Sequence, residues 1–300
     1  METSNLKAHI FVLLATFLVA GSFLASHNLA TVVNPFSLTL LRFVISFILL
    51  APFILLQSSR RSEIIPMLPR AMVISFFYSG YFLAMFEALK TTTVLNTGTL
   101  YTLVPLLTAI FAFFIFKEKI TFNKFIVYLI GVFGTIWVIF KADIQLLLEF
   151  SLNSGDYIYI IGAVSMCFYS ISLKLVHKKS DNSLNMVFAT LIGGMFWMSL
   201  FMLFFNEPLN WTLIQGDLVY SMLYLAIITT LLTLYLYQKA TAILGPTRVM
   251  SYVYLNPIAV VLLLFVVQNV AIETVIIPGI LISCIATFFL QRNNKAIKSE

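Results

Sequence analysis

The chain has 300 residues, of which 61% are hydrophobic and only 10% charged, and its mean hydropathy is +1.00. A water-soluble domain carries about 25% charged residues. This composition excludes a soluble catalytic domain and indicates an integral membrane protein surrounded by a lipid bilayer. The two cysteines, Cys167 and Cys284, are too few for a disulfide framework and lack metal-ligand spacing.

Apolar segments of membrane-spanning length recur along the whole chain. A bilayer core about 30 Å thick needs about 20 mostly apolar residues per helix. The first segment follows Lys7 but lacks a clear small-x-small cleavage site, so we expect a helix there rather than a signal peptide. Ten spans are predicted, at residues 10–29, 36–56, 71–89, 97–116, 125–140, 157–176, 184–205, 218–240, 249–267 and 272–290.

Basic residues are distributed very unequally about these spans. With the N-terminus placed inside the cell, 15 of the 18 Lys and Arg fall on the cytoplasmic side. Lys90 and Lys141 fall on the opposite side, and Arg42 lies within a span. The positive-inside rule therefore predicts a multi-pass protein of the cytoplasmic membrane with both termini cytoplasmic. These flanks account for the net charge of +6, which thus indicates no nucleic-acid partner.

The two halves of the sequence are related by a shift of 152 residues. Under this shift Pro105 aligns with Pro257, and each proline lies inside the fourth span of its half. Five spans per half require the second copy to cross the membrane in the opposite sense. The predicted fold is an all-α integral membrane protein with ten transmembrane helices in two inverted five-helix repeats, residues 1–150 and 151–300, within one membrane domain. Such repeats are typical of transporters that bind substrate between the copies.

Several short motifs follow one another in a fixed order. Spans 1 and 2 carry Ala20-Gly21-Ser22-Phe23 and Asn34-Pro35-Phe36…Leu41-Arg42-Phe43. The first half continues with Phe86-Glu87-Ala88-Leu89-Lys90, Leu103-Val104-Pro105-Leu106-Leu107 and Phe116-Lys117-Glu118-Lys119. The second half repeats part of this series as Tyr237-Gln238-Lys239-Ala240 and Tyr254-Leu255-Asn256-Pro257-Ile258. In order and spacing the whole chain resembles the drug/metabolite transporter superfamily, specifically its EamA-type members with ten helices.

This resemblance implies export of a small metabolite, often an amino acid or a derivative, without ATP hydrolysis. The sequence contains no G-x-x-x-x-G-K-[ST] phosphate loop and no H-E-x-x-H metal motif, so we expect no cofactor, no metal and no enzymatic activity. Glu118 occupies the acidic position that follows the fourth helix in the family. The matching residue of the second half is Val270, which departs from the pattern, and Glu273 lies three residues beyond it.

Arg42 is the most informative single residue. It lies about two turns inside the second span, where a charge at the helix centre costs roughly 2.5–3.5 kcal/mol. One interpretation is an anchor for a substrate carboxylate, or one half of a gating ion pair with Glu87, which is predicted at similar depth. The alternative is that Arg42 snorkels to the outer interface and that Glu87 faces outer water beside Lys90. The sequence leaves both interpretations open.

Tyrosines and small polar residues recur near the middle of six spans. A tyrosine offers a ring for stacking and a hydroxyl for hydrogen bonding, which suits an amphipathic solute in a cavity, whereas helix packing or an interfacial belt is the alternative for any one of them. Together with Arg42 and Glu87, the predicted substrate-binding residues are Ser22, Tyr78, Tyr81, Tyr101, Tyr169, Ser170, Tyr235, Gln238, Tyr252 and Asn256. Pro105 and Pro257 are predicted to kink their helices, either freeing carbonyls for a cavity or only bending the chain.

The leading functional hypothesis is a secondary exporter of a small polar or amphipathic metabolite. Efflux of cationic or drug-like compounds would need an unpaired carboxylate at depth, and only Glu87 comes close. A lipid-modifying transferase or an intramembrane protease would need clustered His, Asp or Ser-Lys pairs, and the spans show none. A non-transporting scaffold would need neither the mid-span polar residues nor the inverted symmetry.

Overall fold

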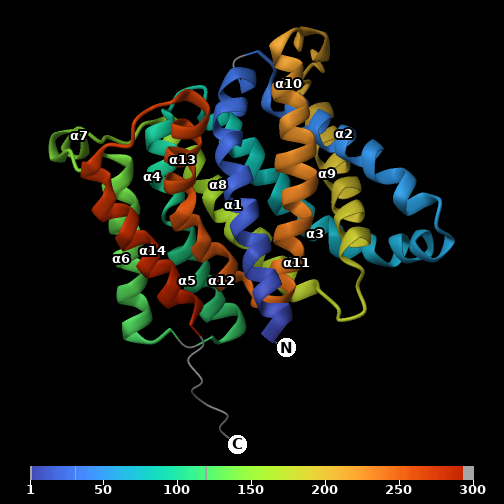
Figure 1. Ribbon diagram of the computed structural model, residues 1–300. Helices are drawn as coiled ribbons and strands as arrows, with labels where there is room; N and C mark the ends of the chain where they lie inside the picture. The colour runs from blue at the N-terminus through green and yellow to red at the C-terminus, as the bar shows by residue number, and fades with distance from the viewer. Residues whose placement is uncertain (1, 31, 119, 293–300) are drawn as a thin grey trace, which may run out of the picture.

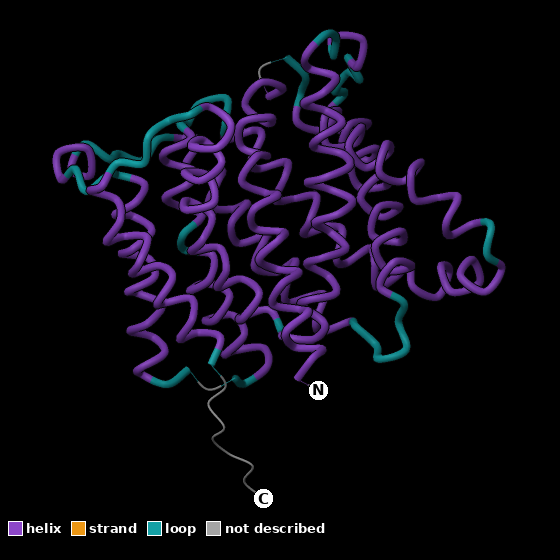
Figure 2. The backbone as a smooth tube through the Cα atoms, in the orientation of Figure 1, coloured by secondary structure: helices purple, strands orange, loops and turns teal. Residues whose placement is uncertain are grey.

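The computed structural model describes residues 2–30, 32–118 and 120–292, and these ranges contain helices and loops but no strand. The helices form one bundle, with their connections gathered mainly at its two ends (Figures 1 and 2). In the first half they are α1 (Glu2–Ala30), α2 (Pro35–Leu55), α3 (Ser58–Ala88), α4 (Val94–Tyr101), α5 (Val104–Phe116), α6 (Phe122–Ile139) and α7 (Ile144–Leu148). In the second half they are α8 (Ser154–Val176), α9 (Ser183–Phe205), η1 (Trp211–Leu213), α10 (Asp217–Leu223), η2 (Tyr224–Leu232), α11 (Thr233–Leu244), α12 (Pro246–Ser251), η3 (Tyr252–Leu255), α13 (Asn256–Gln268), η4 (Thr274–Ile276) and α14 (Ile277–Gln291).

Within those ranges, ten helical segments are long and apolar enough to cross a bilayer, which confirms the ten predicted spans. The largest difference is at the third span, which was expected to begin at residue 71. α3 begins at Ser58 instead, and contains Pro66 and Pro69. The two prolines and the preceding arginines indicate a loop, but the helix continues through them. Its first turns run sideways from the end of α2 before it enters the bundle (Figure 2).

Spans 4 and 9 are each interrupted at corresponding places. α4 ends at Tyr101 and α5 begins at Val104, whereas α12 passes through the 3-10 segment η3 before α13 begins at Asn256. Pro105 and Pro257 lie in the first turn of the new helix, where the missing N–H has no intrahelical partner to lose. The two interruptions are related by the same 152-residue shift as the sequence.

The two halves interlock. α2 packs on α9 and α6 packs on α14, so span 2 contacts span 7 and span 5 contacts span 10. The packing of α3 on α8 is repeated by α11 on α1. A two-fold axis in the membrane produces this pattern, because it exchanges span 3 with span 8 and span 6 with span 1. The beginning of α1 and the end of α14 lie at the same end of the bundle (Figure 1), as an even number of spans requires.

An ion pair joins the halves at the end of the bundle where the chain begins. Arg70 of α3 donates from both terminal nitrogens to Asp181, at 2.6 and 2.9 Å, and also to the Val176 carbonyl at 2.9 Å. The Asp181 side chain is only 3% exposed. Burial raises the pKa of Asp181, but hydrogen bonds from Arg70 and from the Lys178 backbone outweigh it and hold the pKa below its usual value.

We expect Asp181→Asn to destabilise the protein by about 1–3 kcal/mol at pH 7, because it leaves a partly buried guanidinium without its anion. The lowered folded-state pKa means that the pair stabilises the fold above a pH of about 4 and loses this effect as the pH falls through the folded-state value. Thermal unfolding in detergent should therefore separate wild type and Asp181→Asn at pH 7 and bring them together in acid.

The control for this prediction is Glu87→Gln. Glu87 pairs with Lys90 at 2.7 Å, but both side chains are 42% exposed, and such pairs contribute only about 0–1 kcal/mol. An unfolding temperature at pH 7 that falls no further for Asp181→Asn than for Glu87→Gln would contradict the stabilising role of the Arg70–Asp181 pair.

Candidate functional site

Arg42 lies in the interior of the bundle and not at its surface. Its side chain comes from α2, and the residue is only 1% exposed. Nε donates to the Thr230 hydroxyl at 3.0 Å, and Nη2 donates to the Thr229 hydroxyl at 3.3 Å. Both threonines lie midway along span 8, between Asp217 and Leu244. The guanidinium therefore lies against the middle of span 8, between the two halves of the chain.

The two threonines that bind the guanidinium lie in a stretch of widened helix. Residues Tyr224–Leu232 form the π-helical segment η2, in which each backbone bond spans five residues instead of four. The Thr229 and Thr230 hydroxyls both donate to the Leu225 carbonyl, at 3.1 and 2.7 Å. Ser46 of α2 also donates to the Ala226 carbonyl at 2.7 Å. Long π-helical segments are rare and frequently occur at functional sites.

The charge of Arg42 is balanced only in part. The guanidinium carbon lies 4.0 Å from the centroid of the Phe82 ring and 5.8 Å from that of Phe86, and a desolvated cation–π contact contributes about 2 kcal/mol. Among the described residues no salt bridge joins Arg42 to an acidic side chain. Nη1 is buried and has no hydrogen-bond partner. Nη1 therefore lacks a hydrogen-bond acceptor, and an anionic acceptor would form the stronger bond.

Glu87 does not supply that acceptor. Although it follows Phe86 directly in α3, its carboxylate binds Lys90 at the exposed end of the helix. The proposed gating pair between Arg42 and Glu87 is therefore absent, because consecutive residues of a helix point to different sides. Phe86 faces the guanidinium, and Glu87 faces outward.

The tyrosines of α3, α4 and α8 form one aromatic layer beside Arg42. Tyr78 lies 4.8 Å from Phe82 and 4.9 Å from Tyr169, centroid to centroid. Tyr81 lies 5.2 Å from Phe82 and 5.9 Å from Tyr101. The four predicted tyrosines Tyr78, Tyr81, Tyr101 and Tyr169 are thus brought together in one cluster with Phe82, which Tyr78 and Tyr81 contact directly. All four are nearly fully buried, which places ring faces and hydroxyls inside the bundle.

Two further predicted residues are buried among the second-half helices. The Gln238 amide donates to the Thr190 hydroxyl at 3.0 Å, but its carbonyl oxygen has no partner. The Ser170 hydroxyl of α8 is buried without a partner as well. Unpaired buried polar groups are costly, about 1–3 kcal/mol each, so each of these atoms is a candidate contact for a polar solute.

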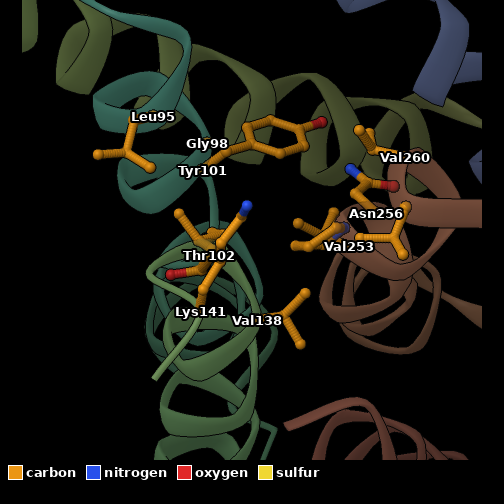
Figure 3. A pocket seen from close by; sticks show the side chains of 12 residues that line it. Leu95, Gly98, Tyr101, Thr102, Val138, Lys141, Val253, Asn256 and Val260 are labelled. Atoms are coloured by element: carbon orange, nitrogen blue, oxygen red, sulfur yellow. The ribbon is translucent and has the colours of Figure 1, made fainter. Parts of the chain in front are cut away.

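A cavity of about 280 Å³ lies where both interrupted spans meet the end of α6. Figure 3 shows Leu95 and Thr102 of the first half facing Val253 and Asn256 of the second half across it. Asn256 is 5% exposed, and neither its amide nitrogen nor its carbonyl oxygen has a hydrogen-bond partner. Lys141, whose ammonium group binds Glu273, also lines the cavity. The remaining lining is mostly apolar, and includes Gly98, Tyr101, Val138, Ile139, Pro257, Val260 and Val261. The cavity thus combines mostly apolar walls with one unsatisfied amide and one paired lysine.

Three predicted residues lie apart from this cluster. Ser22 donates to the Val19 carbonyl of its own helix at 2.7 Å. Tyr235 accepts from Lys239 at 2.9 Å, and the Tyr252 hydroxyl lies 2.9 Å from His9 Nδ1. Tyr252 lines a different cavity of about 340 Å³, together with Leu6, His9, Leu255, Cys284, Thr287, Phe288 and Gln291. Mid-span position alone therefore does not select the residues that meet Arg42.

The site also contains residues that the sequence did not single out. Thr229 and Thr230 hold the guanidinium, Phe82 and Phe86 stack on it, and Tyr159 extends the aromatic layer to within 6.5 Å of Tyr101. The adjacent threonines at the centre of span 8 are the one available sequence signal. Their significance depends on η2, and its sequence contains no proline or glycine that marks a π-helix.

Glu118 and Glu273, the carboxylates that follow spans 4 and 9, lie at opposite ends of the bundle. Glu118 binds Lys174 of α8 at 2.7 Å, and Glu273 binds Lys141 at 2.6 Å. Each ion pair joins one half of the chain to the other. Val270 is half exposed and brings no charge to its end of the bundle.

The comparisons with known proteins agree with this architecture. The sequence profile of the EamA-like transporter family matches the chain twice, over residues 6–140 and 153–292. Among curated proteins, the uncharacterized transporter YyaM of Bacillus subtilis (strain 168) is 24% identical over 188 residues. These residues are 63% of this chain and 61% of the length of YyaM.

The fold is also known from experiment. A chain of known crystal structure shares it with a TM-score of 0.72 at 20% identity, over 97% of this chain and 96% of the other. The resemblance noted in the sequence is confirmed by the two matched repeats. This chain belongs to the EamA-like transporter family and is a multi-pass membrane protein.

Proposed function

We propose that this chain is a secondary transporter which exports a small metabolite, such as an amino acid or a derivative, across the cytoplasmic membrane through a path between its two halves. The observation that carries the proposal is the set of polar atoms buried there without partners, on Arg42, Gln238 and Asn256. They come from spans 2, 8 and 9, and two of the three residues lie at mid-membrane depth. A scaffold would gain nothing from these costly groups, whereas a solute can satisfy them.

The interrupted spans support the same proposal. Half-helices that end inside the membrane expose backbone groups that a substrate can use, and they typically mark the binding site of transporters with inverted repeats. Here the interruption of span 4 and that of span 9 border one cavity, with Tyr101 and Thr102 from the first and Asn256 from the second. A solute in this region would contact both halves at once.

Efflux of cationic compounds is the competing proposal. It requires an unpaired carboxylate in the interior, and in the described part of the chain the acidic side chains nearest the spans are already engaged. Glu87, Glu118 and Glu273 each bind a lysine, and Asp181 binds Arg70. Asp156 is buried but accepts from the Asn96 amide and the Asn153 backbone at 2.8 Å, and caps α8. The export of an uncharged or anionic metabolite therefore agrees better with the interior.

Counterflow in proteoliposomes tests the proposal. Vesicles that hold purified protein are loaded with one unlabelled metabolite and diluted into a trace of the same labelled metabolite. Transient accumulation above the level of protein-free vesicles, for at least one member of an amino-acid and organic-acid panel, is the expected result. No accumulation by properly inserted protein across the whole panel would overturn the proposal for these metabolites.

The proposed orientation has both termini in the cytoplasm, because 15 of the 18 Lys and Arg then lie on that side. In a Cys167→Ser, Cys284→Ser background, Ser4→Cys and Ser299→Cys should be shielded from an impermeant thiol reagent in intact cells and react after lysis. Ser151→Cys is the control, since Ser151 is exposed at the opposite end of the bundle and should react without lysis. Labelling of either terminal cysteine in intact cells would contradict this orientation.

A further inference from the structure

Among the residues that the structure describes, no carboxylate forms an ion pair with Arg42. The carboxylates joined to a basic residue form their pairs at the two ends of the bundle, and the buried Asp156 caps α8. The partners of the guanidinium are instead two neutral hydroxyls and two aromatic rings. A guanidinium keeps its proton at any accessible pH. The positive charge at the centre of the bundle is thus a permanent feature of the protein.

The contacts leave one edge of the guanidinium free. The planar group has five N–H donors, and the hydrogen bonds to Thr230 and Thr229 use one on Nε and one on Nη2. Both donors of Nη1 are buried without a partner. Phe82 covers one face of the group at 4.0 Å. The edge formed by Nη1 and Nη2 therefore remains for a planar acceptor with two oxygens, and a carboxylate fits a guanidinium edge in this way.

The surroundings of that edge indicate the rest of the ligand. Phe82 and Phe86 turn ring faces toward the charge, and the rings of Tyr78 and Tyr81 pack against Phe82. An aromatic body gains offset or edge-on contacts with such rings in addition to its buried area. We infer that the transported solute is an organic anion whose carboxylate binds the Nη1–Nη2 edge of Arg42. Its apolar or aromatic body lies against the aromatic layer that contains Phe82, Tyr78 and Tyr81. That the solute is transported rests on the proposed function, but its binding to this site can be tested separately.

The test measures binding without transport. Purified full-length protein in detergent is heated in the presence of acetate, phenylacetate, indole-3-acetate or L-phenylalanine, at constant ionic strength. Phenylacetamide and 2-phenylethylammonium keep the ring of phenylacetate but replace its charge. We expect at least one aromatic carboxylate to raise the unfolding temperature in a saturable manner, since a ligand that binds only the folded state stabilises it. Acetate should be weaker, and the amide and the cation should have no such effect.

Three variants assign the effect to Arg42. Arg42→Gln should weaken the apparent affinity for the carboxylate at least tenfold, which corresponds to about 1.4 kcal/mol. Arg42→Lys keeps the charge but not the two-pronged edge, so it should prefer the carboxylate to the amide with lower affinity. Thr230→Val keeps the shape of the side chain but removes the acceptor of Nε, and should weaken carboxylate binding less than Arg42→Gln. If Arg42→Gln does not fold, Arg42→Lys and Thr230→Val still carry the test.

The results separate the two proposals. Stabilisation by the amide or the cation equal to that by the carboxylate, an unchanged affinity in the Arg42 variants, or no stabilisation by any carboxylate would each overturn the anion site. Carboxylate binding through Arg42 without counterflow of any carboxylate would leave the site intact and overturn the transport proposal. Counterflow of an amino acid that Arg42→Gln does not affect would leave the transport proposal intact and overturn the assignment of the anion site to Arg42.

Discussion

Arg42→Gln is expected to reduce the initial rate of transport at least tenfold while the protein remains inserted in the membrane. Glutamine keeps hydrogen-bonding capacity but removes the buried charge, the free Nη1 donors and the cation–π contact with Phe82. If a solute carboxylate binds this edge, the loss of a charge-assisted, two-pronged contact amounts to at least about 1.4 kcal/mol. The measurement is initial-rate counterflow at matched amounts of reconstituted protein.

Glu87→Gln is the matched control for this prediction. An ion pair between Arg42 and Glu87 would make both single variants defective and would make the losses in the double variant less than additive. Because the structure pairs Glu87 with Lys90 instead, Glu87→Gln should transport at a near-normal rate. The double variant should behave like Arg42→Gln alone. Near-normal transport by Arg42→Gln would remove Arg42 from the site.

Gly279→Ala is expected to cause the second large effect, on folding rather than on transport. The added methyl group would lie 2.9 Å from the Gly134 carbonyl oxygen and 2.8 Å from Cδ1 of Trp137. Gly134 and Trp137 belong to α6, and Gly279 to α14, so the two helices would have to move apart. Overpacking of a close contact costs about 1–3 kcal/mol. A lower unfolding temperature and a lower yield of monodisperse protein in detergent are the expected observations.

Gly98→Ala provides the comparison. Gly98 is also helical, but the nearest atom to its added methyl group is the end of the Ile139 side chain at 4.0 Å. Alanine is favoured over glycine inside a helix by up to about 1 kcal/mol, so Gly98→Ala should be as stable as wild type or slightly more stable. Equal stability of the two variants would show that the approach of α6 and α14 is looser than the structure indicates.

The ten spans and the two-half organisation follow from simple features of the sequence. Apolar length locates eight of the spans to within about five residues at either end, because the thickness of the bilayer sets the length of each segment. α1 begins eight residues earlier than expected, at Glu2. The third span extends thirteen residues earlier than expected, to Ser58. The added turns contain Arg60, Arg61 and Pro66, so apolar length does not mark them as part of the span. The aligned Pro105 and Pro257 lie in the first turn after the interruptions of spans 4 and 9.

The candidate site was predicted less completely, for geometric reasons. A charge in the middle of an apolar segment is costly wherever it points, so Arg42 stands out from composition alone. Its partners depend on helix rotation and packing, which the sequence pattern does not give. Thr229 and Thr230 bind it from within the π-helical η2, and Glu87 turns away while Phe86 turns inward. Ser22, Tyr235 and Tyr252 have suitable chemistry at mid-span but other partners.

The most direct test of the central claim is counterflow with a series of metabolites that differ in charge. Anionic, zwitterionic, neutral and cationic members of matched size are assayed in vesicles that hold either wild type or Arg42→Gln. We predict that every solute accumulated by wild type carries a carboxylate, and that its rate falls at least tenfold with Arg42→Gln. Accumulation by wild type of a cation or neutral solute without a carboxylate, at a rate that Arg42→Gln leaves unchanged, would contradict the role of Arg42 as the anchor of a transported anion.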